Sequence, residues 1–295
     1  PLALTEARHV KAAQPWMLDL LAPDRCRVDA RFRGHLKLAL TLAGLPVEDL
    51  AGYTVGDPLS FTLRETCVSG KPFQLRDYQR EAGEIFHAAG SVKGGCGTVV
   101  LPCGAGKTVV AIGAMALAQC HTLILTTNVV AVRQWIREIL DKTTLTEDQV
   151  GEYTGEVKDI KPVTLATYQI LTYRQKKDAD FPHFGLFAAK KWGLIVYDEV
   201  HLLPAPVFRV SAEVQATRRL GLTATLVRED GKEGDVFALI GPKRYDVPWK
   251  TLEAQGWIAT ATCTEIRLPQ PISRYVEYAQ STDRERVRIA SENPA

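Results

Sequence analysis

The sequence predicts an α/β protein built on a doubly wound parallel sheet. Its 295 residues are enough for about two domains, one of them large enough to bury a full core. Between residues 98 and 223, short apolar runs alternate with helical patterns. The runs are nearly all apolar, which is typical of strands covered by helices on both faces. Strands that alternate with helices form parallel βαβ units.

The expected elements follow one another in a regular order. Strands are predicted at 98–101, 122–126, 163–167, 194–197 and 219–223, and helices at 108–118 and 129–140. Before the sheet, a helix is expected at 34–43, where Leu36, Leu40 and Ala43 share one face. After it, a mixed-charge helical pattern covers 282–291.

Turn-forming residues divide the chain into three parts. Gly52, Gly56, Asp57 and Pro58 cluster just before residue 60, which indicates a boundary there. We therefore expect a small N-terminal α+β domain at 1–60 and the sheet domain at 61–268. Residues 269–295 read as a connector toward a further domain. Because the chain begins at Pro1 without an initiating Met, we interpret it as a fragment.

Composition excludes several classes of protein. The 36 basic and 34 acidic residues give a net charge of +2, too balanced to indicate nucleic-acid binding by bulk charge, so any such site must come from local clusters. No apolar stretch approaches the 18 or so residues of a membrane span, so no membrane partner is expected. The 6 cysteines include no C-x-x-C pair, which disfavours zinc and predicts free thiols in a cytoplasmic protein.

The strongest chemical signal is a glycine-rich loop that follows the strand at 98–101 and opens the next helix. In such a loop, backbone N–H groups and the helix N-terminus hold phosphates, a lysine reaches their β and γ oxygens, and a hydroxyl meets Mg²⁺. The residues assigned to the nucleotide are Pro102, Cys103, Gly104, Ala105, Gly106, Lys107 and Thr108. Leu101 stands where the full motif has its first glycine, so only the second half of the fingerprint is matched.

A second signal, D-E-V-H at 198–201, ends the apolar strand at 194–197. Asp198 is predicted to hold Mg²⁺ together with Thr108, and Glu199 to orient or deprotonate an attacking water. The alternative for a lone acidic pair is a solvated turn. Because parallel strands end at one edge of a sheet, the two motifs should meet there.

Together these motifs resemble those of superfamily 2 helicases, and residues 75–295 resemble the XPB helicase family. The segment Leu75-Arg76-Asp77-Tyr78-Gln79 is similar to the family's adenine-reading segment, which implies that Arg76 and Gln79 contact the base. Further similarities are Gln134-Trp135 to motif Ia, 166–168 to motif Ib, 221–225 to motif III, and Arg228-Glu229-Asp230 to the R-E-D signature that XPB proteins carry after motif III. Residues 25–58 resemble the end of the family's damage-recognition domain.

This resemblance implies a RecA-like first lobe of an ATP-hydrolysing DNA helicase, acting in repair or DNA opening with ATP and Mg²⁺. It implies that His201 acts with Asp198 and Glu199 by relaying contacts between the ATP site and motif III. It also implies single-stranded or forked DNA as a partner. The residues expected to contact DNA or couple it to ATP are Gln134, Thr167, Tyr168, Thr223, Ala224, Thr225, Arg228, Glu229 and Asp230.

The resemblance further implies a second RecA-like lobe with an arginine finger, which the chain lacks, so weak hydrolysis is expected. A repair nuclease or a transcription-repair complex is a further implied partner. Two alternatives stay open: another DNA-translocating ATPase of superfamily 2, of the type III restriction or remodelling kind, and a non-catalytic DNA-binding module. The R-E-D tripeptide argues against the first, and the intact Lys107, Thr108, Asp198 and Glu199 argue against the second.

Other conspicuous residues receive structural interpretations. Trp16, Trp249 and Trp257 are expected in the core, because isolated tryptophans more often pack than stack on bases. Two basic pairs, Lys190 with Lys191 and Arg218 with Arg219, are expected at solvated edges.

Overall fold

A computed structural model describes residues 2–28, 36, 39–40, 43–45, 55–91, 94–174, 182–203, 216–225, 239–260, 262, 264–265 and 272–292. The backbone contacts divide the chain into one unit at 1–258 and another at 259–295. The domain boundaries expected near 60 and 268 stay predictions.

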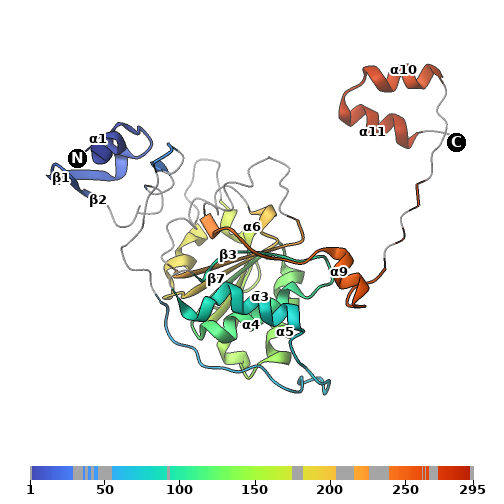
Figure 1. Ribbon diagram of the computed structural model, residues 1–295, viewed down its shortest axis with the longest axis horizontal. Coiled ribbons are helices and arrows are strands. Elements are labelled where there is room, and N and C mark those ends of the chain that lie inside the picture. The colour runs from blue at the N-terminus through green and yellow to red at the C-terminus, as the bar shows by residue number, and fades with distance from the viewer. Residues whose placement is uncertain are drawn as a thin grey trace. The chain divides into compact units, whose positions relative to one another are not determined.

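A parallel sheet of seven strands forms the centre of the first unit (Figure 1). Its strands are β3 (Cys96–Val100), β4 (Thr122–Thr126), β5 (Val150–Tyr153), β6 (Val163–Thr167), β7 (Leu194–Asp198), β8 (Arg218–Thr223) and β9 (Lys243–Asp246). Their spatial order is β5-β6-β4-β7-β8-β3-β9, and every pair is parallel. This confirms the predicted fold class. The sequence patterns missed β5 and β9, the two edge strands, because V-G-E-Y and K-R-Y-D are short and partly polar.

Helices cover both faces of the sheet. On one face, α3 (Asp77–His87), α4 (Lys107–Ala118) and α5 (Val129–Lys142) bury an apolar cluster that includes Ile124 of β4; Figure 1 shows these three helices together. On the other face, α6 (Tyr168–Thr172) and the 3₁₀ helix η5 (Pro182–Ala188) pack over a second cluster that includes Leu123 and Leu125. Neighbouring residues of β4 thus enter opposite cores, as strand alternation requires.

The residues that precede α3 hydrogen-bond to the C-terminal ends of α4 and α5. The N–H of Leu59 donates to the Gln119 carbonyl (3.0 Å), and the N–H of Arg64 donates to the Lys142 carbonyl (2.8 Å). Both acceptors lie where a helix ends and its carbonyls lack helical partners. The segment therefore caps the two helices at the ends remote from the glycine-rich loop.

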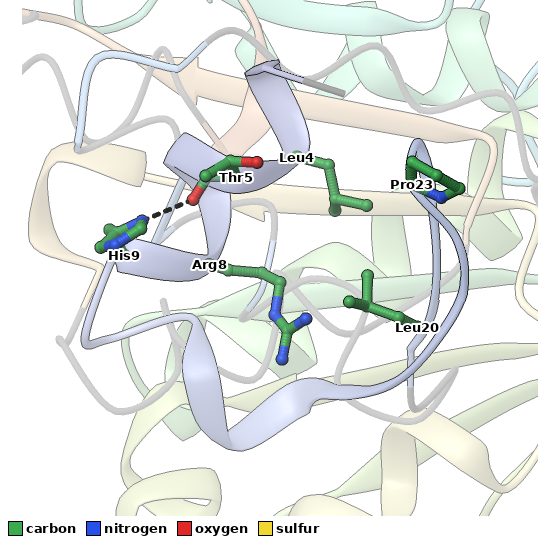
Figure 2. A pocket seen from close by; sticks show the side chains of 6 residues that line it. All are labelled: Leu4, Thr5, Arg8, His9, Leu20 and Pro23. Atoms are coloured by element: carbon green, nitrogen blue, oxygen red, sulfur yellow. Dashed lines mark hydrogen bonds between the residues drawn. The ribbon is translucent and has the colours of Figure 1, made fainter.

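The N-terminal part combines a helix and a hairpin, as expected for an α+β domain. Helix α1 (Leu2–His9) and the 3₁₀ turn η1 (Gln14–Trp16) precede the antiparallel strands β1 (Met17–Ala22) and β2 (Arg25–Val28). An open pocket of about 220 Å³ lies between α1 and the hairpin, and Figure 2 shows Arg8 and Leu20 lining it. Leu36, Ala39 and Leu40 are helical, whereas most of the helix predicted at 34–43 lies outside the described residues.

The described residues of the second unit form helices α10 (Ile272–Gln280) and α11 (Asp283–Ser291). The predicted helix at 282–291 is therefore confirmed, and Thr282 caps it, with its N–H donating to Glu285 Oε2 (3.0 Å). Two further results concern the whole described chain. Cys26, Cys67, Cys96, Cys103 and Cys120 are free thiols as predicted. None of the helices within these ranges has the length and apolarity needed to span a bilayer.

We expect the substitution I124A to lower the free energy of unfolding by about 2–5 kcal/mol, because it leaves a cavity in the core between the sheet and its helices. Ile124 is fully buried at the centre of β4. Urea unfolding followed by circular dichroism measures the loss. The matched control is V130A, because Val130 is 74% exposed and its truncation should change stability by at most about 0.5 kcal/mol. Equal losses in the two variants would contradict this account of the core.

Candidate nucleotide-binding site

The glycine-rich loop joins β3 to α4 in the conformation expected of a phosphate loop. Gly104 and Gly106 have φ angles of 80° and 78°, which favour glycine because other residues are strained there. At Gly106 space matters too, because a Cβ would lie 2.6 Å from Gln79 Nε2. Leu101, which replaces the motif's first glycine, is fully buried and so extends the apolar end of β3 into the core.

Helix α3 holds this loop from behind. The Tyr78 hydroxyl donates to the Ala105 carbonyl (2.6 Å), and Gln79 Nε2 donates to the same oxygen (3.1 Å). The side-chain Oε1 of Gln79 accepts from the Arg76 N–H (3.1 Å). Gln79 is only 4% exposed, so its amide is committed to the protein. Its expected contact with a base stays a prediction.

The acidic motif reaches the loop from a strand two places away. β7 ends at Asp198, and Glu199 turns the chain with a φ of 49°. Lys107 Nζ lies 3.2 Å from Glu199 Oε1. The two motifs therefore meet at the carboxyl edge of the sheet, as the parallel topology predicts.

Asp198 is half-buried and held by three donors. Trp135 Nε1 donates to its Oδ2 (2.9 Å), the Glu199 N–H donates to its Oδ1 (3.1 Å), and the Tyr168 hydroxyl donates to its main-chain carbonyl (2.9 Å). Burial raises the pKa of Asp198, and the charge of Glu199 adds to this, whereas the Trp135 bond and Lys107 act in the opposite direction. The carboxylate is thus kept in place while its charged form is costly.

His201 connects the acidic motif to the end of β8. Its Nδ1 lies 2.9 Å from Thr223 Oγ1 and 3.5 Å from Glu199 Oε2. The Thr223 hydroxyl also donates to the Thr225 carbonyl. A polar chain therefore runs from Lys107 through Glu199 and His201 to Thr223.

The Lys107–Glu199 end of this polar chain borders a cavity of about 450 Å³. It is lined by Gly104, Gly106, Lys107, Thr108, Val109, Ala131, Gln134, Trp135, Glu138, Asp198 and Glu199. Four of these residues, 131, 134, 135 and 138, lie on α5 at the spacing of one helix face. Trp135 was named in the motif Ia similarity but was not assigned to the site, and Glu138 was not named. The spacing of one helix face, counted from Ala131, is the signal that could have added both.

The residues expected to contact or couple DNA occupy different environments. Gln134 lines the cavity beside Lys107, so it faces the phosphate loop. Thr167, Tyr168 and Thr223 are buried, and their expected roles stay predictions. Ala224 is half-buried and Thr225 is exposed. Arg228, Glu229 and Asp230 lie outside the described residues.

Two structural expectations were wrong. Trp249 and Trp257 are 39% and 44% exposed because α9 (Trp249–Ala254) buries Leu252 instead, while Trp16 is half-buried. Arg219 is buried, and its Nη1 donates to the Leu239 carbonyl (2.9 Å), so it does not lie at a solvated edge. Of the other paired bases, Lys191 is exposed, and Lys190 and Arg218 are half-buried.

Known proteins resemble this chain over its whole length. Residues 72–228 match the family described as type III restriction enzyme, res subunit. The DNA 3'-5' helicase XPB of Kineococcus radiotolerans is 52% identical over 99% of this chain and 50% of its own length. Its namesake in Mycobacterium tuberculosis is 52% identical over 98% and 50%. The general transcription and DNA repair factor IIH helicase/translocase subunit XPB/SSL2 of Saccharomyces cerevisiae is 36% identical over 75% and 27%.

The chain thus spans about half the length of the first two relatives. Among solved structures, the match to the structure of T4 UvsW covers 78% of this chain and 47% of the UvsW chain, with 16% sequence identity and a TM-score of 0.49.

We expect W135F to raise the pKa of Asp198 further, because the indole N–H bond stabilises the charged carboxylate. In the variant, Asp198 should keep its proton to a higher pH, so its charged form is lost sooner as the pH falls. A pH titration of ¹³C-labelled aspartate carboxyls by NMR measures the shift, with D198N identifying the resonance. An unchanged or lowered midpoint would show that the bond does not control this titration.

Proposed function

The chain belongs to the family described as type III restriction enzyme, res subunit, and from this premise we propose that it is the ATP-binding half of an ATP-driven DNA helicase of the XPB type. The observation that carries the proposal is the Lys107–Glu199 pair at 3.2 Å, beside a cavity lined by the phosphate loop and Asp198. This ion pair joins Lys107, which would bind the γ-phosphate, to Glu199, which would activate water. Residues 1–60 are proposed as a separate domain and 61–268 as the first motor lobe.

The phosphate loop supplies the first part of the proposed site. Gly104 and Gly106 allow the backbone N–H groups to turn toward the phosphates, and the N-terminus of α4 adds its partial positive charge. Lys107 would leave Glu199 to bind the β and γ oxygens, because two phosphate oxygens offer it more charge than one carboxylate. Nucleotide binding would thereby free Glu199 for catalysis.

The donors in the cavity suit a hard divalent cation. Thr108 and Asp198 both line it, and oxygen ligands from one or two side chains plus phosphates are what Mg²⁺ prefers. We propose that these two residues hold Mg²⁺, which supplies neutralisation of phosphate charge when bound. Trp135 and Tyr168, through their bonds to Asp198, would keep the carboxylate aimed at this position.

Hydrolysis requires a base near the attacking water, and Glu199 is proposed to be that base. Its carboxylate would take a proton from the water as the oxygen attacks the γ-phosphorus and the bond to the β-phosphate oxygen breaks. His201, with Nδ1 3.5 Å from Glu199 Oε2, would hold the carboxylate in place. Its bond to Thr223 gives the end of β8 a direct connection to the base.

DNA is the proposed substrate of the complete motor. This proposal is supported by the two relatives at 52% identity, each of which is named DNA 3'-5' helicase XPB. The same name favours 3'-5' movement for the motor to which this chain belongs. Thr223, Thr225 and the R-E-D segment at 228–230 are proposed to couple DNA to the ATP site. The alternative of a restriction-type translocase rests on the family description, but 52% identity to XPB proteins favours the helicase.

We expect K107A and E199Q to separate nucleotide binding from hydrolysis. K107A removes a charge-assisted contact with phosphate and should weaken Mg-ATP binding by about 10- to 100-fold. E199Q removes the base and should slow hydrolysis by about 10²- to 10⁴-fold. Because it also releases Lys107 from its ion pair, its ATP affinity should equal or exceed that of the wild type. Isothermal titration calorimetry and phosphate release with added DNA measure the two effects.

The matched control is K243A, which removes a half-exposed lysine paired with Asp246 on β9. It should change neither binding nor hydrolysis. The proposed roles would fail if E199Q lost as much affinity as K107A, or if K107A still bound Mg-ATP like the wild type.

A further inference from the structure

An exposed tryptophan lies against the residue expected to read the base. The guanidinium carbon of Arg76 is 4.3 Å from the centroid of the Trp257 ring, within the range of a cation–π contact. Trp257 keeps 44% of its surface exposed. Its ring is therefore available at the protein surface as a flat support for the Arg76 side chain.

The backbone around Trp257 is anchored on both sides. Leu252 of α9 is fully buried, and Ile258 packs against the same apolar cluster. Between them, Gly256 turns the chain with a φ of 73°, and the Trp257 N–H donates to the Leu252 carbonyl (2.9 Å). The position of the backbone that carries the ring is thus set by the fold.

Arg76 is held from a second direction as well. Its Nη1 donates to the Tyr78 hydroxyl (3.1 Å), which in turn donates to the Ala105 carbonyl of the phosphate loop (2.6 Å). The guanidinium therefore lies between an indole face and a tyrosine that is bonded to the loop. Stacking uses the face of the guanidinium, so the in-plane N–H donors that Tyr78 does not occupy can still form hydrogen bonds with a ligand.

We propose that Trp257 is a positioning residue for the base of the bound nucleotide, acting by holding the Arg76 guanidinium in the orientation that hydrogen-bonds adenine. This rests on the proposed function, in which the cavity binds ATP. A long arginine side chain loses rotamer freedom when it binds a ligand, and an arginine already held by an aromatic face loses less. Trp257 would accordingly increase affinity for the base and leave affinity for the phosphates unchanged.

The test compares two ligands that share phosphates but differ in the base. Calorimetry measures the dissociation constants of Mg-ATP and of Mg-tripolyphosphate. The proteins compared are the wild type, W257A, W257F, R76A and the double variant R76A/W257A. We expect W257A to weaken ATP binding by about two- to fivefold, the range of an exposed cation–π contact, with no change for tripolyphosphate. W257F keeps an aromatic face and should recover most of the loss. W249A is the matched control, because Trp249 is a similarly exposed tryptophan on α9, and it should change neither constant.

The arginine background tests whether Trp257 acts through Arg76. In R76A, the further change W257A should have no effect on ATP binding. The inference would be overturned if W257A left ATP binding intact, weakened both ligands equally, or still weakened ATP binding in R76A, the last result meaning direct contact with the base. A wild type that binds neither ligand would overturn the proposed function along with it, whereas one that binds both with no effect of W257A would overturn this inference alone.

Discussion

The parallel pairing of β3, β8 and β7 is the constraint on which the candidate site depends. β8 pairs with β3 over residues 96–100 and with β7 over 194–198, so the loops that follow β3 and β7 emerge at one edge, about 10 Å apart at the usual strand spacing. A lysine side chain can cross much of that gap, and Lys107 does so to reach Glu199. The same pairing brings Thr223, at the end of β8, between the two loops and into contact with His201.

Buried aromatic donors fix the polar groups around this edge. Tyr78 donates to Ala105 in the phosphate loop, and Trp135 and Tyr168 donate to Asp198. All three aromatic residues are at least nine-tenths buried, and an aromatic ring has few rotamers, so each donor has a well-defined direction. A loop and a carboxylate that would otherwise be mobile are thus oriented by the apolar core behind them. The apolar core and the candidate site are in this sense one structure.

Sequence patterns predicted the parts that depend on local apolarity and on loop chemistry. β4 and β6 lie at the predicted residues, because nearly every residue of these strands is buried and the apolar run is unbroken. β5 and β9 escaped prediction because edge strands face solvent on one side and carry polar residues. Asp198, Glu199 and Lys107 were identifiable from spacing, whereas the hydrogen bond from Trp135 to Asp198 was not, since the two residues lie 63 positions apart. Trp257 was placed in the core because nothing in its neighbourhood signals that Leu252 takes that position.

The order of strands in the sheet also decides when the phosphate loop can become structured during synthesis. β3 lies between β8 and β9, both of which follow it by more than about 100 residues along the chain. At a ribosomal rate of about 5–20 residues per second, β3 waits for several seconds or more before either neighbour has been made. Until then the glycine-rich loop extends from an unpaired apolar strand, which is the kind of segment that chaperones and aggregation act on. The β4–β6 pair, whose members are closer in sequence, can form first. The nascent protein therefore acquires its nucleotide-binding edge late, and from an interior strand, β3, that was synthesised before every other strand of the sheet.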